Sequence, residues 1–218
     1  MRPRPRLLDL YSGAGGAAVG YHRAGFDVVG VDIKRQPRYP FEHHVADALE
    51  FLAAHGHEYD AVHASPPCQA YSISTLPNRL TGKQYPDLVA ATRTGLVAAG
   101  RPWVIENVPG APVRPDFKLC GCMFGLPRLK RERLFETSWR GFDLRAPCHH
   151  PEPVISVCGH DVPSHARKFG GPVSLALRKL AMGIDWMGRD ELGLAIPPAY
   201  TEFIGEQLLA HLATEAPA

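Results

Sequence analysis

The chain has 218 residues and a mass of 23.9 kDa, with 45% hydrophobic and 21% charged residues. These values are ordinary for a globular protein and allow one good core, so a second full domain would have to be small. The net charge of +2 and the pI near 8.3 are too mild to indicate a nucleic-acid partner by themselves. No apolar run reaches the length of a membrane span or of a signal peptide, so we expect a cytoplasmic protein without a membrane partner.

The first half of the chain alternates between strand and helix patterns. The predicted elements are a strand at 7–11, a helix at 17–24, a strand at 27–32, a helix at 48–55 and a strand at 61–65. A small-residue turn, Ser-Gly-Ala-Gly-Gly, joins the first strand to the first helix. This order predicts an α/β protein.

The second half begins regularly and then changes texture. The predicted elements are a loop at 66–83, a helix at 85–99, a strand at 103–107, a strand at 133–137, and helices at 172–182 and 198–212 separated by a turn at 183–186. Between Val108 and about Gly171 proline, glycine, histidine and cysteine are frequent, and only the strand at 133–137 is convincing there. We expect this segment to be an irregular insert.

Several polar residues fall at the ends of predicted strands. Tyr11, Asp32, Ser65 and Asn107 each end one strand. A mainly parallel sheet with helices on both faces binds its ligands at the carboxyl ends of its strands. We therefore expect the loops after these residues to meet at one crevice.

The glycine turn and the acid after the second strand suggest a nucleotide-like ligand. Gly13, Gly15 and Gly16 allow the backbone to turn tightly against a ligand, and Asp32 could accept hydrogen bonds from ribose hydroxyls. The same pattern fits a nicotinamide cofactor, and a glycine turn that serves packing alone is a third interpretation.

Cys68 is the most informative residue of the chain. It follows two prolines at the end of a strand, in a polar loop where an apolar structural cysteine would be out of place. Glu106 lies at the end of the next strand, which would bring a carboxyl group to the same crevice. The pair predicts a nucleophile with an acid beside it.

The order of these motifs resembles that of the cytosine-C5 DNA methyltransferases, and the resemblance covers nearly the whole chain. It rests on the segments Asp-Leu-Tyr-Ser-Gly-Ala-Gly-Gly at 9–16, Pro-Pro-Cys-Gln at 66–69, Glu-Asn-Val at 106–108, Arg-Glu-Arg at 131–133 and Ile-Pro-Pro-Ala-Tyr-Thr at 196–201. The resemblance implies a Rossmann-like fold that binds S-adenosylmethionine (SAM) and a small phage or bacterial type of enzyme with a reduced target-recognition region.

Carried over position by position, the resemblance implies two groups of site residues. The catalytic group is Cys68 as the nucleophile toward cytosine C6, Glu106 at N3, and Arg131 and Arg133 at the O2 side. The cofactor group is Tyr11, Ser12, Gly13, Gly15, Gly16, Asp32, Ile33, Asp47 and Pro67, with Asp32 at the ribose and Asp47 at the adenine amino group. The implied partner is DNA, bound by a monomer.

The resemblance also implies a division of the chain. We expect a SAM-binding and catalytic core at 1–135, a reduced target-recognition insert at 136–171, and carboxyl-terminal helices that complete the core at 172–218. Cytosine must leave the DNA stack before attack. The polar loop at 69–83 is the candidate to close over it, with Arg79 and Lys83 either near phosphate or simply solvated.

The other cysteines raise the question of a metal. Cys120, Cys122, Cys148 and Cys158 lie near His149, His150 and His160 in the irregular segment. A zinc site could replace the missing core of the insert. The spacing fits no common zinc pattern, so ordinary thiols are favoured and no metal is expected.

Three alternatives remain open. A NAD-dependent oxidoreductase explains the glycine turn but leaves Cys68 and Glu106 without a role. A DNA-binding relative without activity would not need both residues. Cytosine-C5 methylation of RNA or of a free nucleotide would use the same chemistry.

Overall fold

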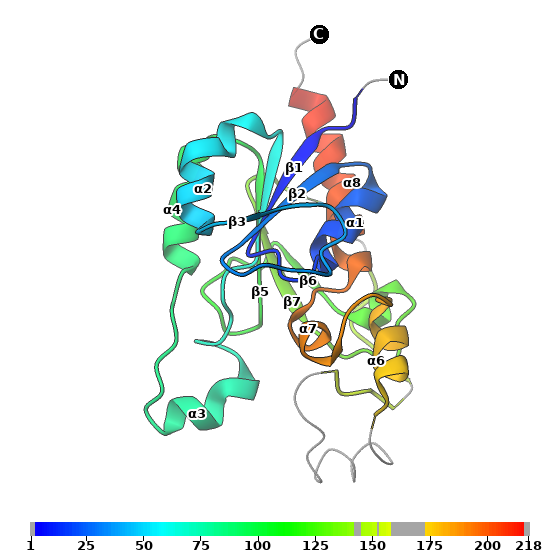
Figure 1. Cartoon of the computed structure of the whole chain (residues 1–218). Coiled ribbons are helices and arrows are strands. Elements are labelled where there is room, and N and C mark those ends of the chain that lie inside the picture. Colours follow the sequence, from blue (N-terminus) through cyan, green and yellow to red (C-terminus); the bar gives the residue numbers. More distant parts are fainter. Residues whose placement is uncertain (1–2, 142–144, 152, 158–172, 216–218) are drawn as a thin grey trace.

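A seven-stranded sheet forms the centre of the computed structural model, which describes residues 3–141, 145–151, 153–157 and 173–215 (Figure 1). Its strands are β1 (Arg6–Leu10), β2 (Asp27–Asp32), β3 (Glu42–Val45), β4 (Ala61–Ala64), β5 (Trp103–Asn107), β6 (Phe117–Leu119) and β7 (Arg133–Thr137). They lie in the order β3-β2-β1-β4-β5-β7-β6. The strands β1 to β5 run parallel, and β7 is antiparallel to both β5 and β6.

Helices cover both faces of the sheet. The described helices are α1 (Gly16–Ala24), α2 (Ala48–His55), α3 (Leu76–Leu80), α4 (Val89–Ala99), α6 (Leu175–Met182), α7 (Arg189–Leu194) and α8 (Pro198–Glu215). The helices α1 and α8 lie on one side of the sheet and α2 and α4 on the other (Figure 1). Successive strand residues point to opposite faces, so Leu7 packs with α1 and α8 while Leu8 packs with α2 and α4. The expected α/β fold, a mainly parallel sheet between two helical layers, is confirmed.

The helices α1 and α8 lie unusually close together. A Cβ atom on Gly20 would overlap the Thr201 hydroxyl and the Pro198 carbonyl, and one on Gly16 would overlap the Ile196 carbonyl. The Thr201 hydroxyl donates to the Ala17 carbonyl at 2.8 Å. Small residues on α1 therefore allow the end of the chain to pack against its beginning.

The short helices gather at the carboxyl edge of the sheet. In Figure 1, α3 extends below the sheet on the side of α2 and α4, and α6 and α7 lie below it on the side of α8. A third apolar cluster joins α6 and α7 to the irregular segment through Met182, Leu192, Leu129, Ile155 and Val157. The carboxyl edge is thus flanked by irregular structure on both sides.

Most predicted elements match the structure closely. The strands at 27–32, 103–107 and 133–137 and the helix at 48–55 have the predicted bounds. The strands predicted at 7–11 and 61–65 end one residue earlier, at Leu10 and Ala64. The last helix begins at Pro198 as predicted and continues to Glu215.

Other predictions need correction. The predicted loop at 66–83 contains a short 3₁₀ turn, η2 (Ile73–Thr75), and the helix α3. The helix predicted at 85–99 begins only at Val89, because Pro86 restricts the backbone before it and the Asp87 carboxylate accepts from the Val89 amide. The helix predicted from 172 begins at Leu175, where Ser174 caps it through the Leu177 amide. Strands β3 and β6 and helix α7 were not predicted.

Candidate active site

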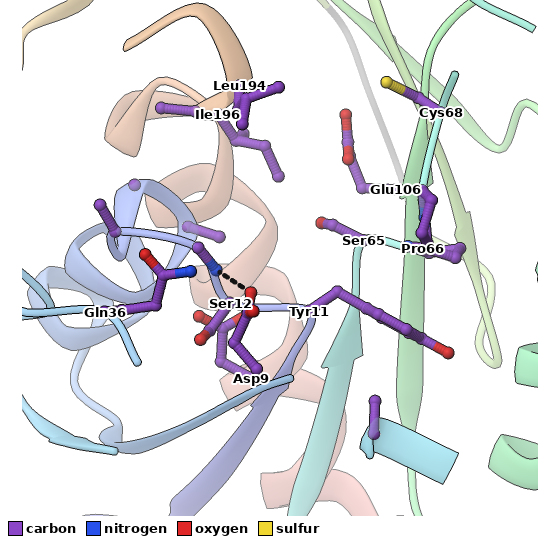
Figure 2. A pocket seen from close by; sticks show the side chains of 18 of the residues that line it. Asp9, Tyr11, Ser12, Gln36, Ser65, Pro66, Cys68, Glu106, Leu194 and Ile196 are labelled. Atoms are coloured by element: carbon purple, nitrogen blue, oxygen red, sulfur yellow. Dashed lines mark hydrogen bonds between the residues drawn. The ribbon is translucent and has the colours of Figure 1, made fainter. Parts of the chain in front are cut away.

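A cavity of about 440 Å³ opens at the carboxyl edge of the parallel strands, where the sequence predicted a crevice. In Figure 2, Cys68, Glu106 and Ser65 lie on one side and Gln36, Leu194 and Ile196 on the other. The predicted site residues that line this cavity are Tyr11, Ser12, Gly13, Gly16, Asp32, Ile33, Asp47, Pro67, Cys68, Glu106 and Arg133. Gly15 and Arg131 are not among its lining residues.

The glycine turn forms one end of the cavity. Tyr11 and Gly13 have positive φ values of 57° and 50°, so the backbone leaves β1 in a sharp turn. The Asp32 carboxylate accepts from the Gly13 amide at 3.0 Å and from the Lys34 amide at 2.9 Å. Gly15 has a φ of 83° and packs against Tyr39 and Pro40, so its contribution is to backbone geometry. Asp32 thus fixes the turn from inside the cavity.

The wall beside this turn is built by α2, α4 and the end of β2. The Asp47 carboxylate caps α2 by accepting from the Leu49 amide at 2.8 Å. The Tyr11 hydroxyl bonds to Thr92 of α4 at 2.9 Å, which fixes its ring along the cavity. Ile33 is 68% exposed and offers the cavity an apolar side chain. Such an apolar wall next to a carboxylate suits a planar, polar-edged ring.

Asp9 lies in the cavity lining, although the sequence analysis assigned it no role. Its Oδ2 accepts from the Tyr39 hydroxyl at 3.3 Å, while its buried Oδ1 has no partner among the described residues. The pKa of Asp9 is raised to about 8, chiefly because burial disfavours the carboxylate. The hydrogen bond from Tyr39 lowers this pKa, and the Asp32 carboxylate raises it. Near neutral pH, Asp9 can therefore offer a hydrogen to a ligand.

Cys68 lies at the other end of the cavity, directly after the two prolines that leave β4. Its carbonyl accepts from the Tyr71 and Ser72 amides at 3.0 and 2.9 Å, so a tight turn fixes the backbone around the thiol. Burial raises the pKa of the Cys68 thiol and the Glu106 carboxyl raises it further, whereas Arg133 and Arg131 lower it. The thiol is half-buried and faces the cavity.

Glu106 and Arg133 form an ion pair beside this thiol. The Arg133 Nε atom lies 2.9 Å from the Glu106 Oε1 atom, and both side chains are largely buried. Burial raises the pKa of the Glu106 carboxyl, and Arg133, the hydrogen bond from Ser65 and then Arg131 lower it. The pairing arises because β7 lies antiparallel to β5, which brings the Arg-Glu-Arg segment to the end of the strand that carries Glu106.

A buried polar chain supports Glu106 from beneath. Tyr21 and His63 are joined at 3.0 Å, His63 and Ser65 at 2.9 Å, and Ser65 bonds to Glu106. Burial lowers the pKa of His63 to about 3, so its ring is neutral. If the Ser65 hydroxyl donates to Glu106, the neutral His63 ring takes the tautomer in which Nε2 donates to Ser65 and Nδ1 accepts from the Tyr21 hydroxyl. The chain orients the Ser65 hydroxyl toward the carboxyl group.

Arg131 has a different set of contacts from Arg133. It is 4% exposed, its guanidinium donates to the Gly193 carbonyl of α7 at 2.8 Å, and its own carbonyl accepts from Tyr200 at 2.8 Å. These bonds join β7 to α7 and α8. The structure therefore brings Cys68, Glu106 and Arg133 to the cavity and gives Arg131 contacts behind it.

The carboxyl-terminal part of the chain supplies residues that the sequence analysis did not name as site residues. Ala195 and Ile196, between α7 and α8, line the cavity near the glycine turn, and so does Glu191. Glu191 is paired with Arg38 at 3.1 Å, and the Trp186 indole donates to the Ala14 carbonyl at 2.9 Å. The segment at 196–201, one of those that carry the resemblance, therefore begins at the cavity wall with Ile196.

The two basic residues of the predicted closing loop are held by local contacts. Arg79 donates to the Ser72 carbonyl at 3.0 Å, and the Lys83 ammonium lies 5.3 Å from the centre of the Tyr85 ring. Three apolar side chains of the same region, Ile73, Leu76 and Leu80, are exposed.

Comparisons with known proteins find similarity to methyltransferases. No known family model matches the chain. The chain is 26% identical over 190 residues to the type II methyltransferase M.NgoFVII of Neisseria gonorrhoeae, covering 72% of this chain and 50% of that protein. It is 24% identical over 160 residues to the type II methyltransferase M.AplI of Arthrospira platensis, covering 61% and 46% respectively. The chain spans about half the length of the curated relatives it matches.

Solved structures share the whole fold at low sequence identity. One is a protein described as a DNA modification methyltransferase encoded within a prophage of E. coli, with a TM-score of 0.57, 16% identity and coverage of 97% of this chain and 100% of that one. Another is the S. pombe Dnmt2 methyltransferase, with a TM-score of 0.55, 14% identity and coverage of 95% and 99%. The chain thus shares a Rossmann-like fold with these solved methyltransferases. No described helix is long and apolar enough to cross a membrane.

Proposed function

We propose that this protein is a DNA cytosine-C5 methyltransferase that uses SAM and attacks its target base through Cys68. One observation carries the proposal: a half-buried thiol and a buried Glu106–Arg133 pair face the same cavity as a glycine turn held by Asp32. The relatives named as type II methyltransferases support DNA as the substrate. The fold supports SAM as the cofactor.

The glycine end of the cavity fits SAM on the structure's own terms. The whole cavity has a volume of about 440 Å³, which lies within the usual range of small-molecule sites. Two buried oxygens there, Asp9 Oδ1 and Ser12 Oγ, have no partner among the described residues and are available to a ligand. We assign the ribose to Asp32 and the adenine to Ile33 and Asp47. When bound, SAM supplies the methyl group that the activated C5 carbon takes up.

The chain's own residues perform the activation of the base. Cytosine C5 is a poor nucleophile until the Cys68 sulfur forms a bond to C6, which converts the ring to an enamine. Glu106 donates a proton to N3 and so offsets the negative charge that the addition places on the ring. Arg133 stabilises the same charge from the O2 side. Loss of the C5 proton to a base then allows the sulfur to leave and N3 to return its proton to Glu106.

The electrostatic coupling between Cys68 and Glu106 favours this sequence of steps. At rest, burial and the Glu106 carboxyl hold the Cys68 thiol in its protonated form. Transfer of the thiol proton to the Glu106 carboxylate, directly or through water, gives the thiolate, removes its negative neighbour and leaves the positive Arg133 beside the sulfur. The combination of a neutral Glu106 and a Cys68 thiolate is therefore mutually supporting, and it is the combination that the reaction uses.

We also assign recognition of the DNA to the segment at 136–171, with the core at 1–135 and the helices at 172–218 holding the catalytic cavity. In the described part of this segment, Ile155 and Val157 pack against α6 and α7. Opening of the duplex costs a few kcal/mol, which protein contacts to the displaced base must offset. The region with η2 and α3 lies next to Cys68 and is our candidate for those contacts.

The other functions considered fit less well. A NAD-dependent oxidoreductase is not favoured by the methyltransferase relatives, and it gives no role to the thiol and the ion pair. Methylation of RNA or of a free nucleotide would use the same residues, so the substrate has to be tested directly.

The test is the capture of a covalent adduct. Fluorine at C5 blocks the loss of the C5 substituent, so DNA that contains 5-fluorocytosine should form a SAM-dependent complex that survives denaturing electrophoresis, with the cross-link on Cys68. Cys68→Ala should abolish both the adduct and methyl transfer. Glu106→Gln should slow transfer by about 10²–10⁴-fold, the range for a positioned acid, with little change in SAM binding.

Parallel transfer assays with duplex DNA, single-stranded DNA, RNA and dCMP identify the substrate. The proposal predicts transfer to DNA. Full activity in Cys68→Ala, or an adduct on another cysteine, would contradict the mechanism. Transfer to RNA or dCMP alone would keep the mechanism and replace the substrate.

A further inference from the structure

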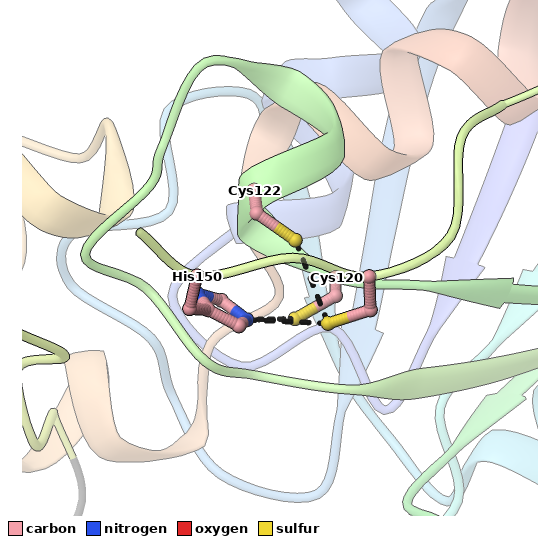
Figure 3. A group of neighbouring side chains, drawn as sticks. Cys120, Cys122 and His150 are labelled. Atoms are coloured by element: carbon pink, nitrogen blue, oxygen red, sulfur yellow. Dashed lines mark hydrogen bonds between the residues drawn. The ribbon is translucent and has the colours of Figure 1, made fainter. Parts of the chain in front are cut away.

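A second group of reactive side chains lies outside the cavity. Cys120 directly follows β6, Cys122 lies in the 3₁₀ turn η3 (Gly121–Phe124), and Cys148 and His150 come from the irregular segment after β7. Their sulfur and nitrogen atoms all lie within 4.8 Å of one another (Figure 3). Cys158 and His160, weighed earlier as ligands, lie outside the described residues.

The distances within this group suit a single tetrahedral ion. The Cys122 and Cys148 sulfurs are 3.5 Å apart, and His150 Nε2 lies 3.3 Å from the Cys120 sulfur and 3.2 Å from that of Cys148. Around zinc, with bonds of about 2.3 Å to sulfur and about 2.0–2.1 Å to nitrogen, a tetrahedron has edges of roughly 3.8 Å between sulfurs and 3.6 Å between sulfur and nitrogen. These three pairs lie a few tenths of an ångström inside those edges and the other pairs lie within 4.8 Å, so side-chain shifts of up to about 1 Å would accommodate the ion.

The histidine is oriented as a metal ligand is. His150 Nδ1 lies 2.9 Å from the Pro127 carbonyl oxygen. A carbonyl oxygen only accepts, so Nδ1 carries the hydrogen and Nε2 presents its lone pair toward the sulfurs. This is the outer contact that fixes the ring of most zinc-bound histidines.

We propose that Cys120, Cys122, Cys148 and His150 bind one zinc ion. Three thiolates and an imidazole in a tetrahedral arrangement select zinc over magnesium or calcium. Four protein ligands close the coordination shell, so the ion is structural and not catalytic. The spacing along the chain had favoured ordinary thiols, because Cys-x-Cys followed at a distance by Cys-x-His matches no common zinc pattern. The fold brings the four ligands together nevertheless.

The ion would connect two parts of the chain close to the catalytic residues. Cys120 is adjacent to Leu119, which pairs with Arg133 in the sheet. Arg145 already holds the irregular segment near η3, since its guanidinium donates to the Met123 carbonyl at 3.0 Å and lies 3.9 Å from the Phe124 ring centre. Zinc would make this attachment permanent and steady the β6–β7 edge beneath Arg133.

The experiment measures metal in the full chain, independently of any activity. The protein is expressed with added zinc, dialysed against a weak chelator and assayed for bound metal by mass spectrometry. We expect one zinc ion per chain. Exchange to cobalt(II) should give the intense visible bands of a tetrahedral thiolate site.

Matched variants assign the ligands. His150→Ala and Cys148→Ser should lose the metal and the cobalt bands, whereas their neighbour His149→Ala and the catalytic-site variant Cys68→Ser should retain both. Cys148 is exposed, so its substitution leaves the core intact, and circular dichroism checks the fold. Cys158→Ser should also retain the metal, because the four described ligands already complete the shell.

Three results would overturn the proposal. The first is that the wild-type chain contains no zinc. The second is that His150→Ala and His149→Ala contain equal amounts of metal. The third is that two free thiols are missing and are found in a disulfide between Cys122 and Cys148. The thiol count is made on the denatured chain, which has five cysteines if all are free.

Discussion

Asp9 is a buried acid with an unusual protonation state. It is 1% exposed and its pKa is raised to about 8, mainly by burial. In the unfolded chain the pKa of an aspartate is about 3.9. Between these two values the native state holds a proton that the unfolded state has lost, so the native state becomes less stable as the pH rises from about 4 to about 8.

We predict that Asp9→Asn removes this dependence. The wild-type free energy of unfolding should fall by up to about 1.4 kcal/mol per pH unit across this window because of Asp9. Asparagine has no proton to lose and can still accept from Tyr39, so its curve should be flatter and should cross above that of the wild type near pH 8. Urea denaturation at half-unit pH steps measures the effect.

Asp27→Asn provides the control for this experiment. Asp27 is an exposed residue at the start of β2, and its side chain makes no hydrogen bond to any residue that the structure describes. Its substitution should leave the wild-type slope in place. A slope in Asp9→Asn equal to that of the wild type would show that Asp9 ionises normally in the folded protein.

The contact between α1 and α8 depends on the absence of a side chain at Gly20. A Cβ there would overlap Thr201 and Pro198 and lie 2.7 Å from the Glu202 amide nitrogen. These are backbone atoms or a hydroxyl with its own bond to Ala17, so they cannot move away easily. We predict that Gly20→Ala destabilises the protein by about 1–3 kcal/mol, the usual effect of overpacking, in spite of the better helix propensity of alanine.

Gly193→Ala in α7 is the matched helical control. Among the described residues, a Cβ on Gly193 would meet only the Val157 carbonyl oxygen, at 3.8 Å, an ordinary contact. Stability should therefore stay the same or rise by up to about 1 kcal/mol. Thermal unfolding of both variants checks the pair, and equal effects would mean that α8 can shift away from α1 at little cost.

The elements that were predicted well are those whose patterns are strong. Strands β2 and β5 are apolar and β-branched, and α2 carries its own cap in Asp47. In contrast, β3 is Glu-His-His-Val, a polar edge strand with no buried residue, and β6 has three residues. Both exist because a neighbouring strand offers them hydrogen bonds. Because this pairing depends on the fold, the local sequence pattern does not predict it.

The candidate site likewise contains residues that the sequence indicates and residues that only the fold reveals. Cys68 and Glu106 could be named because they lie at or just after the carboxyl ends of predicted strands, beside unusual neighbours. Asp9 could not be named in this way, because the strand pattern does not show what surrounds its carboxyl group. Only the fold brings Tyr39 and the cavity next to it. Likewise, the zinc proposal depends on distances between segments 26 or more residues apart, which spacing alone does not give.

Ligand binding should stabilise the whole molecule. A ligand that binds only the native state at 100 times its Kd adds about 2.7 kcal/mol of stability, which for a chain of this size raises the Tm by roughly 5–10 °C. We predict such a shift with SAM and with S-adenosylhomocysteine. Differential scanning fluorimetry measures it, and a shift with NAD in place of SAM would contradict the cofactor assignment.

Asp32→Ala should reduce this stabilisation by SAM. Its carboxylate holds the Gly13 and Lys34 amides, so the unliganded variant is also expected to lose some stability. The experiment therefore compares the change in Tm on adding SAM between the variant and the wild type, and not the Tm of the unliganded proteins. Asp27→Ala, at the opposite end of the same strand, should keep the full shift.

The packing of α8 on α1 also bears on how the protein is made. The hydrogen bond from Thr201 to Ala17 joins residues 184 positions apart, and Ile196 completes the cavity wall beside the glycine turn. On the ribosome, Cys68 and Glu106 emerge long before Arg133 and Ile196. Closing so long a loop is slow, because its entropy must be lost before the contacts form. At a synthesis rate of about 5–20 residues per second, a nascent chain therefore carries the Cys68 thiol for roughly 6–25 s before Ile196 can complete the cavity wall.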